Sequence, residues 1–302
     1  MTPLPCPPVS GQWGAMGFPV ETDYRRWRQK DYRYSFEQFM ALDSLPSGLI
    51  VIDYGAVELA LLIRNRGAEA NFYGFHAAQS PLTRQPVPYF QGRKVAPKRM
   101  NQILISDPSL YLHNDVRVGW FLGNKYCDLP TDLPAIMDRI DALTGAAQRL
   151  LWGNSAGGTA ALLYARETDT AVVMNPQIIL RNFTWSRVQP WLLHGWDIEE
   201  FFEGRQYGID HLDLRDRIRP GRIVYCQNRH DDHVELQLKP LAETLGVSTE
   251  PGDDGRFKLI LGDWGKGHIP PSSEIQQKIV GEEVERMLGK PDGLWTRLGR
   301  RR

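Results

Sequence analysis

The stretch RLLWGNSAGGTAALLYA, residues 149–165, sets a serine between glycines at the junction of two apolar segments. Gly153, Ser155 and Gly157 form the pattern G-x-S-x-G. Glycine is kept where the backbone needs a conformation, or a closeness of approach, that a side chain would prevent. A strand, this pattern and then a helix make a nucleophile elbow, a sharp turn that lifts the serine clear of a sheet. We therefore predict that Ser155 is a nucleophile; the alternative is a tight turn whose serine only caps the helix.

A serine is a poor nucleophile until a general base takes its proton, and the base needs a group that orients it. After a serine elbow the acid and then the histidine are expected, each in a loop after a later strand. His268 lies in such a loop, WGKGHIPP, and is the predicted base, although it could instead hydrogen-bond the loop or cap the next helix. Asp231 and Asp232, in RHDDHV, are both candidates for the acid. Asp231 is favoured because it stands nearer the end of the preceding strand, which leaves Asp232 as an N-cap or a solvated neighbour.

An oxyanion formed by attack on a carbonyl group needs hydrogen-bond donors, which are usually backbone N–H groups. The predicted donors are the N–H of Ala156, at the start of the helix, and that of Ala77 or Ala78, in NFYGFHAAQS. Further candidates for contacting the substrate are Asn154, Asp232, His233 and Trp191. The remaining histidines are expected to be satisfied polar side chains rather than catalysts: His76, His113, His194, His211 and His230. This chemistry needs no metal and no redox cofactor.

Short apolar runs of strand length recur along the chain, and helical periodicity appears between the later ones. The expected strands cover 49–52, 59–63, 72–75, 103–105, 118–122, 150–152, 171–174, 223–226 and 259–261. Apolar residues spaced as on one helix face predict helices over 133–143, before Gly145, and over 275–287, before Gly289. Strands that alternate with helices predict an α/β fold, a mostly parallel sheet with helices on both faces. Only YGAVE separates the first two runs, which predicts an antiparallel hairpin at one edge.

The expected domain organisation is an N-terminal arm (1–46) with one short helix around SFEQFMAL, an α/β domain (47–290) and a basic tail (291–302). Residues 178–220 read as an aromatic, lid-like insertion between two strands. Its aromatic residues could close over the serine or pack as a satellite core: Trp185, Trp191, Trp196, Phe201 and Phe202. The tail is expected to be a solvated end, with an electrostatic anchor as the alternative.

The 302 residues carry 36 basic and 36 acidic side chains, so no global charge favours nucleic acid or an anionic membrane. Cys6, Cys127 and Cys226 are an odd number without a C-x-x-C pair, which argues against a disulfide framework and a structural zinc site. The sequence shows neither a secretion-signal pattern nor an apolar run long enough for an integral membrane segment. We expect a cytoplasmic protein whose oligomeric state the sequence leaves open.

The serine elbow, the aspartate loop and the terminal histidine resemble, in that order, the α/β-hydrolase superfamily over residues 48–290. The strings ISDPSL, GWFLGN, GNSAGGTAALLYA, NPQ, QNRHDDHV and GHIPP also resemble a narrower bacterial group linked to capsular polysaccharide biosynthesis, and more distantly the glycan-acetylating component of accessory secretion systems. The resemblance implies an α/β-hydrolase fold, a triad of Ser155, His268 and Asp231, and acyl transfer on a glycan.

The sequence thus predicts a serine-dependent acyl-ester hydrolase or O-acyltransferase that acts on a small acyl ester or a glycan. Water as the acceptor would make an esterase, and a sugar hydroxyl would make an acyltransferase; both remain open. A non-catalytic scaffold of the same fold, serving surface-glycan synthesis as a binding subunit, is the alternative.

Overall fold

The computed structural model describes residues 20–80, 82–198 and 212–289. Several residues singled out above lie outside the described part: Cys6, Phe201, Phe202, His211 and the tail 291–302.

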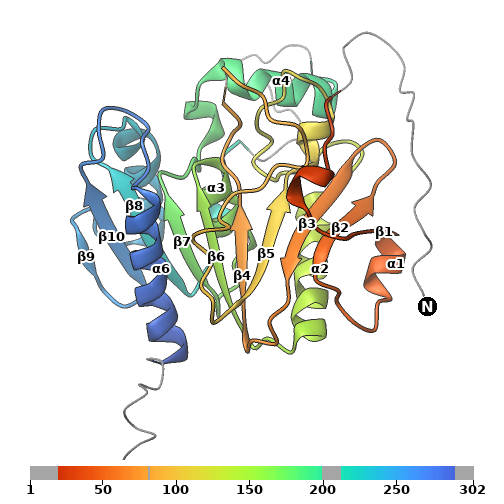
Figure 1. Ribbon diagram of the computed structural model, residues 1–302. Coiled ribbons are helices and arrows are strands. Elements are labelled where there is room, and N and C mark those ends of the chain that lie inside the picture. The colour runs from red at the N-terminus through yellow and green to blue at the C-terminus, as the bar shows by residue number, and fades with distance from the viewer. Residues whose placement is uncertain (1–19, 81, 199–211, 290–302) are drawn as a thin grey trace, which may run out of the picture.

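One sheet of ten strands runs through the described part of the chain, in the order β1-β2-β3-β5-β4-β6-β7-β8-β10-β9 (Figure 1). The strands are β1 (Asp31–Ser35), β2 (Gly48–Asp53), β3 (Glu58–Arg64), β4 (Ala70–Phe75), β5 (Asn101–Ser106), β6 (Gln148–Asn154), β7 (Thr170–Met174), β8 (Arg222–Asn228), β9 (Gly252–Asp253) and β10 (Phe257–Gly262). The pairs β2–β3, β3–β5 and β9–β10 are antiparallel, and the other neighbours are parallel. The predicted α/β fold with a mostly parallel sheet is confirmed.

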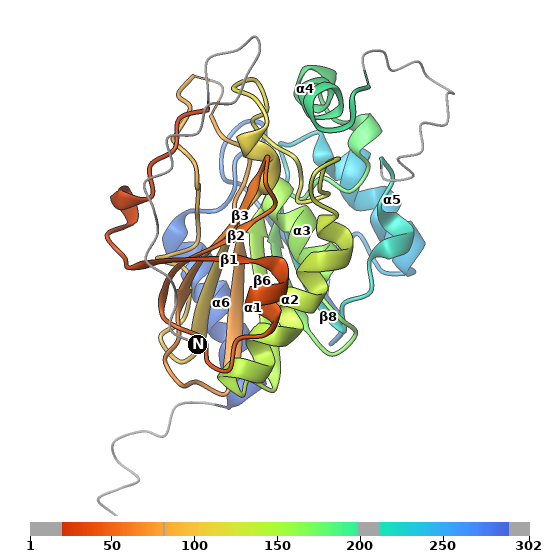
Figure 2. The same ribbon diagram turned by 90° about the vertical axis from the view of Figure 1, so that its right-hand side faces the viewer.

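Helices cover both faces of this sheet. They are α1 (Phe36–Met40), α2 (Leu129–Thr144), α3 (Ala156–Tyr164), α4 (Trp185–Trp196), α5 (Lys239–Leu245) and α6 (Ser273–Leu288), with short turns η1 (Arg25–Trp27), η2 (Pro108–Tyr111), η3 (Leu180–Asn182), η4 (Arg215–Arg217) and η5 (Val234–Leu238). α6 lies on one face, α2 and α3 lie on the other, and α4 lies beyond the end toward which the central strands run (Figures 1 and 2). Among the described residues, no helix combines the length and the apolar character that crossing a bilayer requires.

The central strands are continuous apolar runs because helices cover them on both sides. Every residue of β4, β5, β7 and β8 is buried. The two long predicted helices are confirmed, and their ends follow from capping. Gly145 ends α2 in the left-handed conformation, with φ of 68°, and the Ser272 hydroxyl accepts the Ile275 N–H at the start of α6.

The predicted strand over 118–122 is wrong. This apolar run is a buried loop, in which Trp120 and Phe121 have positive φ angles of 51° and 58°. An extended strand excludes positive φ, so the run cannot join the sheet. Its apolar side chains fill space between the sheet and α4 instead, and apolar composition alone does not separate these two kinds of burial.

The predicted hairpin is confirmed as β2–β3, but it does not lie at the edge of the sheet. β1, whose sequence DYRYS falls within the expected arm, pairs in parallel with β2 and takes the edge. Its residues are only partly buried, which suits the polar and aromatic composition of an edge strand.

Candidate active site

Ser155 stands at a sharp turn between β6 and α3. Its φ and ψ angles are 52° and −120°, a conformation that side-chain-bearing residues rarely adopt, and its N–H donates to the Met174 carbonyl of β7 (2.7 Å). A Cβ at Gly153 would overlap the Gly157 carbonyl, and a Cβ at Gly157 would overlap the Phe75 carbonyl of β4. Both glycines are therefore required for the helix to begin so close to the sheet, which holds the serine in this strained turn.

His268 lies between Ser155 and Asp231. Its Nε2 is 3.0 Å from the Ser155 Oγ, and its Nδ1 is 2.6 Å from the Asp231 Oδ2. Since a carboxylate only accepts, Nδ1 carries the proton and Nε2 presents a lone pair to the serine hydroxyl. The three residues follow the carboxyl ends of β6, β10 and β8, which parallel strands bring to the same edge of the sheet. This is the arrangement of a nucleophile, a base and an orienting acid.

The surroundings keep Asp231 ionised. Burial alone would raise its pKa, but the hydrogen bond from His268, the nearby His233 imidazole and the His233 backbone N–H lower this pKa to about 2. His233 is itself buried, and its ring centroid lies 4.4 Å from that of His268. Burial, and then the adjacent His268, lower the pKa of His233 to about 4, so this second imidazole is neutral at pH 7.

Gln177 contacts the serine, although its sequence context did not predict a site residue. Its Nε2 donates to the Ser155 Oγ (2.7 Å), while its Oε1 accepts the Trp120 Nε1–H (2.7 Å). An indole nitrogen can only donate, so this bond fixes which end of the amide faces Ser155. Gln177 lies within the string NPQ, three residues after β7, where no spacing pattern marks it.

The serine opens onto a pocket of about 340 Å³. Its walls include Ala77, Ala78, Asn154, Gln177, Phe183 and Arg187. Phe183 and Arg187 belong to the expected lid insertion, so the described part of that segment reaches the pocket.

The two alanines differ in what their N–H groups do. The Ala77 N–H donates to the Gln91 Oε1 (2.9 Å), whereas the Ala78 N–H has no hydrogen-bond partner among the described residues. His76 holds this loop, because its Nδ1 donates to the Ala77 carbonyl (2.8 Å) and its Nε2 accepts the Asp107 N–H (2.9 Å). Burial lowers the pKa of His76 to about 4. Of the two alanines, Ala78 is thus the one whose N–H is free among the described residues, and the Ala156 N–H, at the start of α3, lacks an intrahelical partner.

Other predicted contacts lie apart from the pocket. Trp191 is fully buried, donates its Nε1–H to the Gly123 carbonyl (3.0 Å) and packs edge-on against Trp120. Asp232 is exposed at the surface, and of the two aspartates only Asp231 hydrogen-bonds His268. A side-chain hydrogen bond to Asp231 raises the pKa of Asp232. Trp191 thus serves the core beneath α4, and Asp232 lies at the surface beside Asp231.

No family model matches the sequence, and no curated protein matches it. Solved structures do match. A capsule O-acetyltransferase of Neisseria meningitidis serogroup A aligns with a TM-score of 0.56 and 17% identity, over 82% of this chain and 97% of that one. A glycosylation-associated protein complex from Streptococcus agalactiae aligns with a TM-score of 0.56 and 14% identity, over 78% of this chain but only 45% of that one.

An α/β serine hydrolase without lid from Xanthomonas campestris also aligns, with a TM-score of 0.49 and 14% identity, over 82% of this chain and 99% of that one. At such identities the likeness concerns the fold alone. The α/β-hydrolase fold that the sequence predicted is confirmed, and the capsule enzyme is of the kind that its strings resemble.

Proposed function

We propose that this chain is a serine-dependent acyl-ester hydrolase or O-acyltransferase. The observation that carries the proposal is the continuous hydrogen-bonded series from the Asp231 carboxylate through the His268 imidazole to the Ser155 hydroxyl, beside an open pocket. A scaffold would have no physical need to keep a buried carboxylate, a correctly oriented imidazole and a strained serine together.

In the first half of the reaction, the Ser155 Oγ attacks the carbonyl carbon of an ester or thioester while its proton passes to the His268 Nε2. The N–H groups of Ala156 and Ala78 hold the resulting oxyanion. The bond from carbon to the leaving oxygen or sulfur then breaks, and His268 returns the proton to the leaving group. Asp231 stabilises the imidazolium that exists between these two transfers.

In the second half, an acceptor hydroxyl loses its proton to His268 and attacks the acyl carbon, and the Ser155 Oγ leaves and recovers the proton. Gln177 adds a donor at a different atom, the Ser155 Oγ, whereas the N–H groups of Ala156 and Ala78 act on the carbonyl oxygen of the substrate. Because its Nε2–H points at the Ser155 Oγ, it stabilises negative charge on that atom during attack and during its departure.

The acceptor that we propose is a sugar hydroxyl. The likeness in fold to a capsule O-acetyltransferase and the strings that resemble those of glycan-modifying proteins support it. Arg187 lines the pocket and brings a positive charge, and its guanidinium has no hydrogen-bond or ion-pair partner among the described residues. We infer that one of the substrates is anionic.

Fluorophosphonate labelling with intact-mass detection tests the serine. The wild type should gain one adduct, Ser155→Ala should gain none, and His268→Ala should react orders of magnitude more slowly. His230→Ala is the matched control, because His230 is exposed in the loop that carries Asp231, and its side chain pairs with Asp263. Absence of an adduct on the folded wild type would contradict the proposal and favour the non-catalytic scaffold.

A second experiment separates transfer from hydrolysis. Short acyl esters are incubated with and without neutral and acidic sugars, and the acylated sugar is detected by mass. Arg187→Gln should lower kcat/KM for an anionic substrate by about 10-fold or more and leave a neutral one unaffected. Arg181→Gln is the control, since Arg181 is exposed and paired with Asp213 (3.0 Å). Equal losses on charged and neutral substrates would contradict the role of Arg187.

A further inference from the structure

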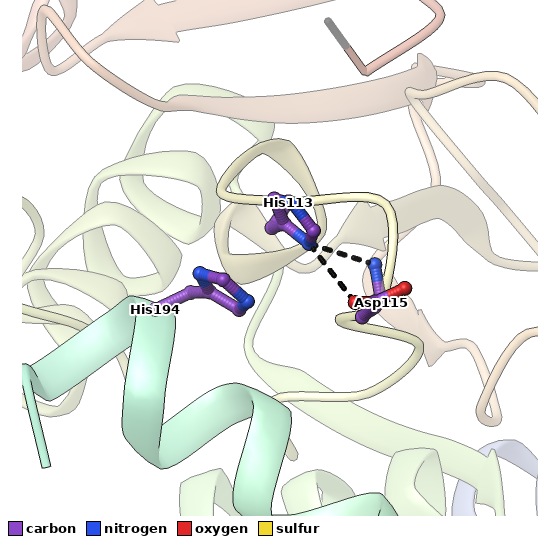
Figure 3. A group of neighbouring side chains, drawn as sticks. All are labelled: His113, Asp115 and His194. Atoms are coloured by element: carbon purple, nitrogen blue, oxygen red, sulfur yellow. Dashed lines mark hydrogen bonds and ion pairs between the residues drawn. The ribbon is translucent and has the colours of Figure 1, made fainter. Parts of the chain in front are cut away.

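Two histidines and an aspartate, none of which lines the catalytic pocket, lie close together (Figure 3). His113 and Asp115 lie in the loop after η2, and His194 lies in α4. One ligand atom from each residue lies within 4.8 Å of those of the other two. The histidine rings face each other with centroids 4.0 Å apart and planes 14° apart, and the His113 Nδ1 is 3.5 Å from the Asp115 Oδ2.

We propose that His113, Asp115 and His194 bind a divalent transition-metal ion, with zinc as the best match. Two imidazole nitrogens and a carboxylate oxygen are the donors that zinc prefers, and a water molecule completes four ligands in many such sites. A metal ion bound there would join α4, which belongs to the lid-like insertion, to the loop after η2 in the core of the domain.

Both imidazoles can offer a lone pair. The His113 Nδ1 accepts the Asp115 N–H (3.2 Å), so this nitrogen is unprotonated, and a metal ion bound to it would replace this hydrogen bond. The imidazole of His194, in its neutral form, also has one nitrogen with a lone pair. The nearby Lys125 ammonium is paired with Asp197, which reduces its repulsion of a bound cation.

The backbone around the three side chains is held in place. The Arg84 Nη1 donates to the carbonyls of Asn114 (2.7 Å) and Val116 (2.8 Å), which fixes the loop that carries His113 and Asp115. On the other side, the Lys125 N–H donates to the Gly195 carbonyl (2.8 Å), which docks the end of α4. Zinc–nitrogen bonds measure about 2.0–2.1 Å, so metal binding requires the two stacked rings to rotate until their lone pairs converge on one point.

Zinc alone, added to the untagged full chain, tests this site. Calorimetry and equilibrium dialysis should find one zinc per chain, and Co²⁺ in its place should give the visible absorption of a four-coordinate ion. His194→Gln should weaken binding by at least about tenfold. Zinc should raise the unfolding temperature of the wild type and not that of His194→Gln.

A second cluster of possible ligands, Asp231, His233 and His268, makes one more variant necessary. His268→Ala should retain the zinc affinity of the wild type, because it leaves the proposed site intact. Equal binding by the wild type and His194→Gln, loss of binding in His268→Ala alone, or no binding at millimolar zinc would each overturn the proposal. Circular dichroism of His194→Gln establishes that the variant is folded, and His113→Gln, which removes a different ligand, should show the same loss.

Discussion

Replacing Gln177 by methionine should slow the reaction of Ser155 and also destabilise the fold. Methionine has a similar length but cannot donate to the Ser155 Oγ or accept the Trp120 Nε1–H. A neutral hydrogen bond contributes about 0.5–1.5 kcal/mol and one to a charged partner about 1.5–3 kcal/mol. Since the Oγ gains negative charge during attack, the second range applies to the rate, and every 1.36 kcal/mol is tenfold. We expect fluorophosphonate labelling to slow by about 10- to 100-fold.

The stability effect comes from Trp120 and is separable from the rate effect. The Trp120 ring is fully buried, and without Gln177 its Nε1–H loses its partner, which costs about 1–3 kcal/mol. Urea denaturation measures this loss, and labelling kinetics are recorded on the fraction that remains folded. If the folded Gln177→Met variant is labelled at a rate within twofold of the wild type, that result refutes the reasoning. The hydrogen bond from Gln177 would then be made to Ser155 before the reaction and would not stabilise the charge that develops on the Oγ.

The variant Trp120→Phe isolates the orienting role of the indole. Phenylalanine keeps an aromatic ring in the core but leaves the Gln177 Oε1 without its donor, so the amide is free to flip. Labelling should slow by less than in Gln177→Met, and the double variant should be no slower than Gln177→Met alone. The effects of substituting two contacting residues of one network usually differ from additivity by about 0.5–3 kcal/mol. If the losses in the two single variants add up in the double variant, the two side chains act independently.

Three further outcomes follow from the geometry. Gly157→Ala should lower the free energy of unfolding by about 2 kcal/mol or more, because the new Cβ would overlap the backbone of β4. In Gly158→Ala the new Cβ would lie 3.1 Å from its nearest neighbours, so urea denaturation should show a loss of less than about 1 kcal/mol. The pKa of His76 falls from 6.5 in the unfolded chain to about 4 in the folded protein, so acid favours the unfolded state, which binds the proton more tightly. The contribution of His76 to the free energy of unfolding should be full above pH 6.5 and should have fallen by about 2 kcal/mol at pH 5. In urea denaturation, His76→Gln should reduce the dependence of the unfolding free energy on pH in this range. Asp231→Asn should slow labelling at pH 7 by about 10³- to 10⁴-fold, and the exposed Asp232→Asn should leave it nearly unchanged.

Features whose cause is local were predictable from the sequence. The elbow follows from Gly153 and Gly157, because each removes a clash that any side chain would make at that turn. α2 and α6 follow from apolar spacing bounded by a glycine or a serine cap. The preference for Asp231 over Asp232 followed from distance to the strand end, and it is Asp231 that contacts His268.

Features that depend on distant contacts were not predictable. The run 118–122 has the composition of a strand, but the positive φ angles of Trp120 and Phe121 arise from packing beneath α4. The edge strand β1 is polar enough to resemble a loop, and only its pairing with β2 gives it regular structure. In both cases tertiary context decides the conformation, and local apolarity points to the wrong element.

The order of the strands explains why Gln177 contacts the serine. β7 lies between β6 and β8 in the sheet, and all three run in parallel. Their carboxyl ends therefore meet at one edge, where the loop after β7 must pass between Ser155, after β6, and Asp231, after β8. Two polar side chains of that loop use this position differently: the Asn175 Oδ1 accepts the Asn228 N–H of β8 (2.8 Å), whereas the Gln177 Nε2 donates to the Ser155 Oγ. The topology therefore brings the loop to the serine, and the packing of the individual side chains, which no motif records, decides that Gln177 makes the contact.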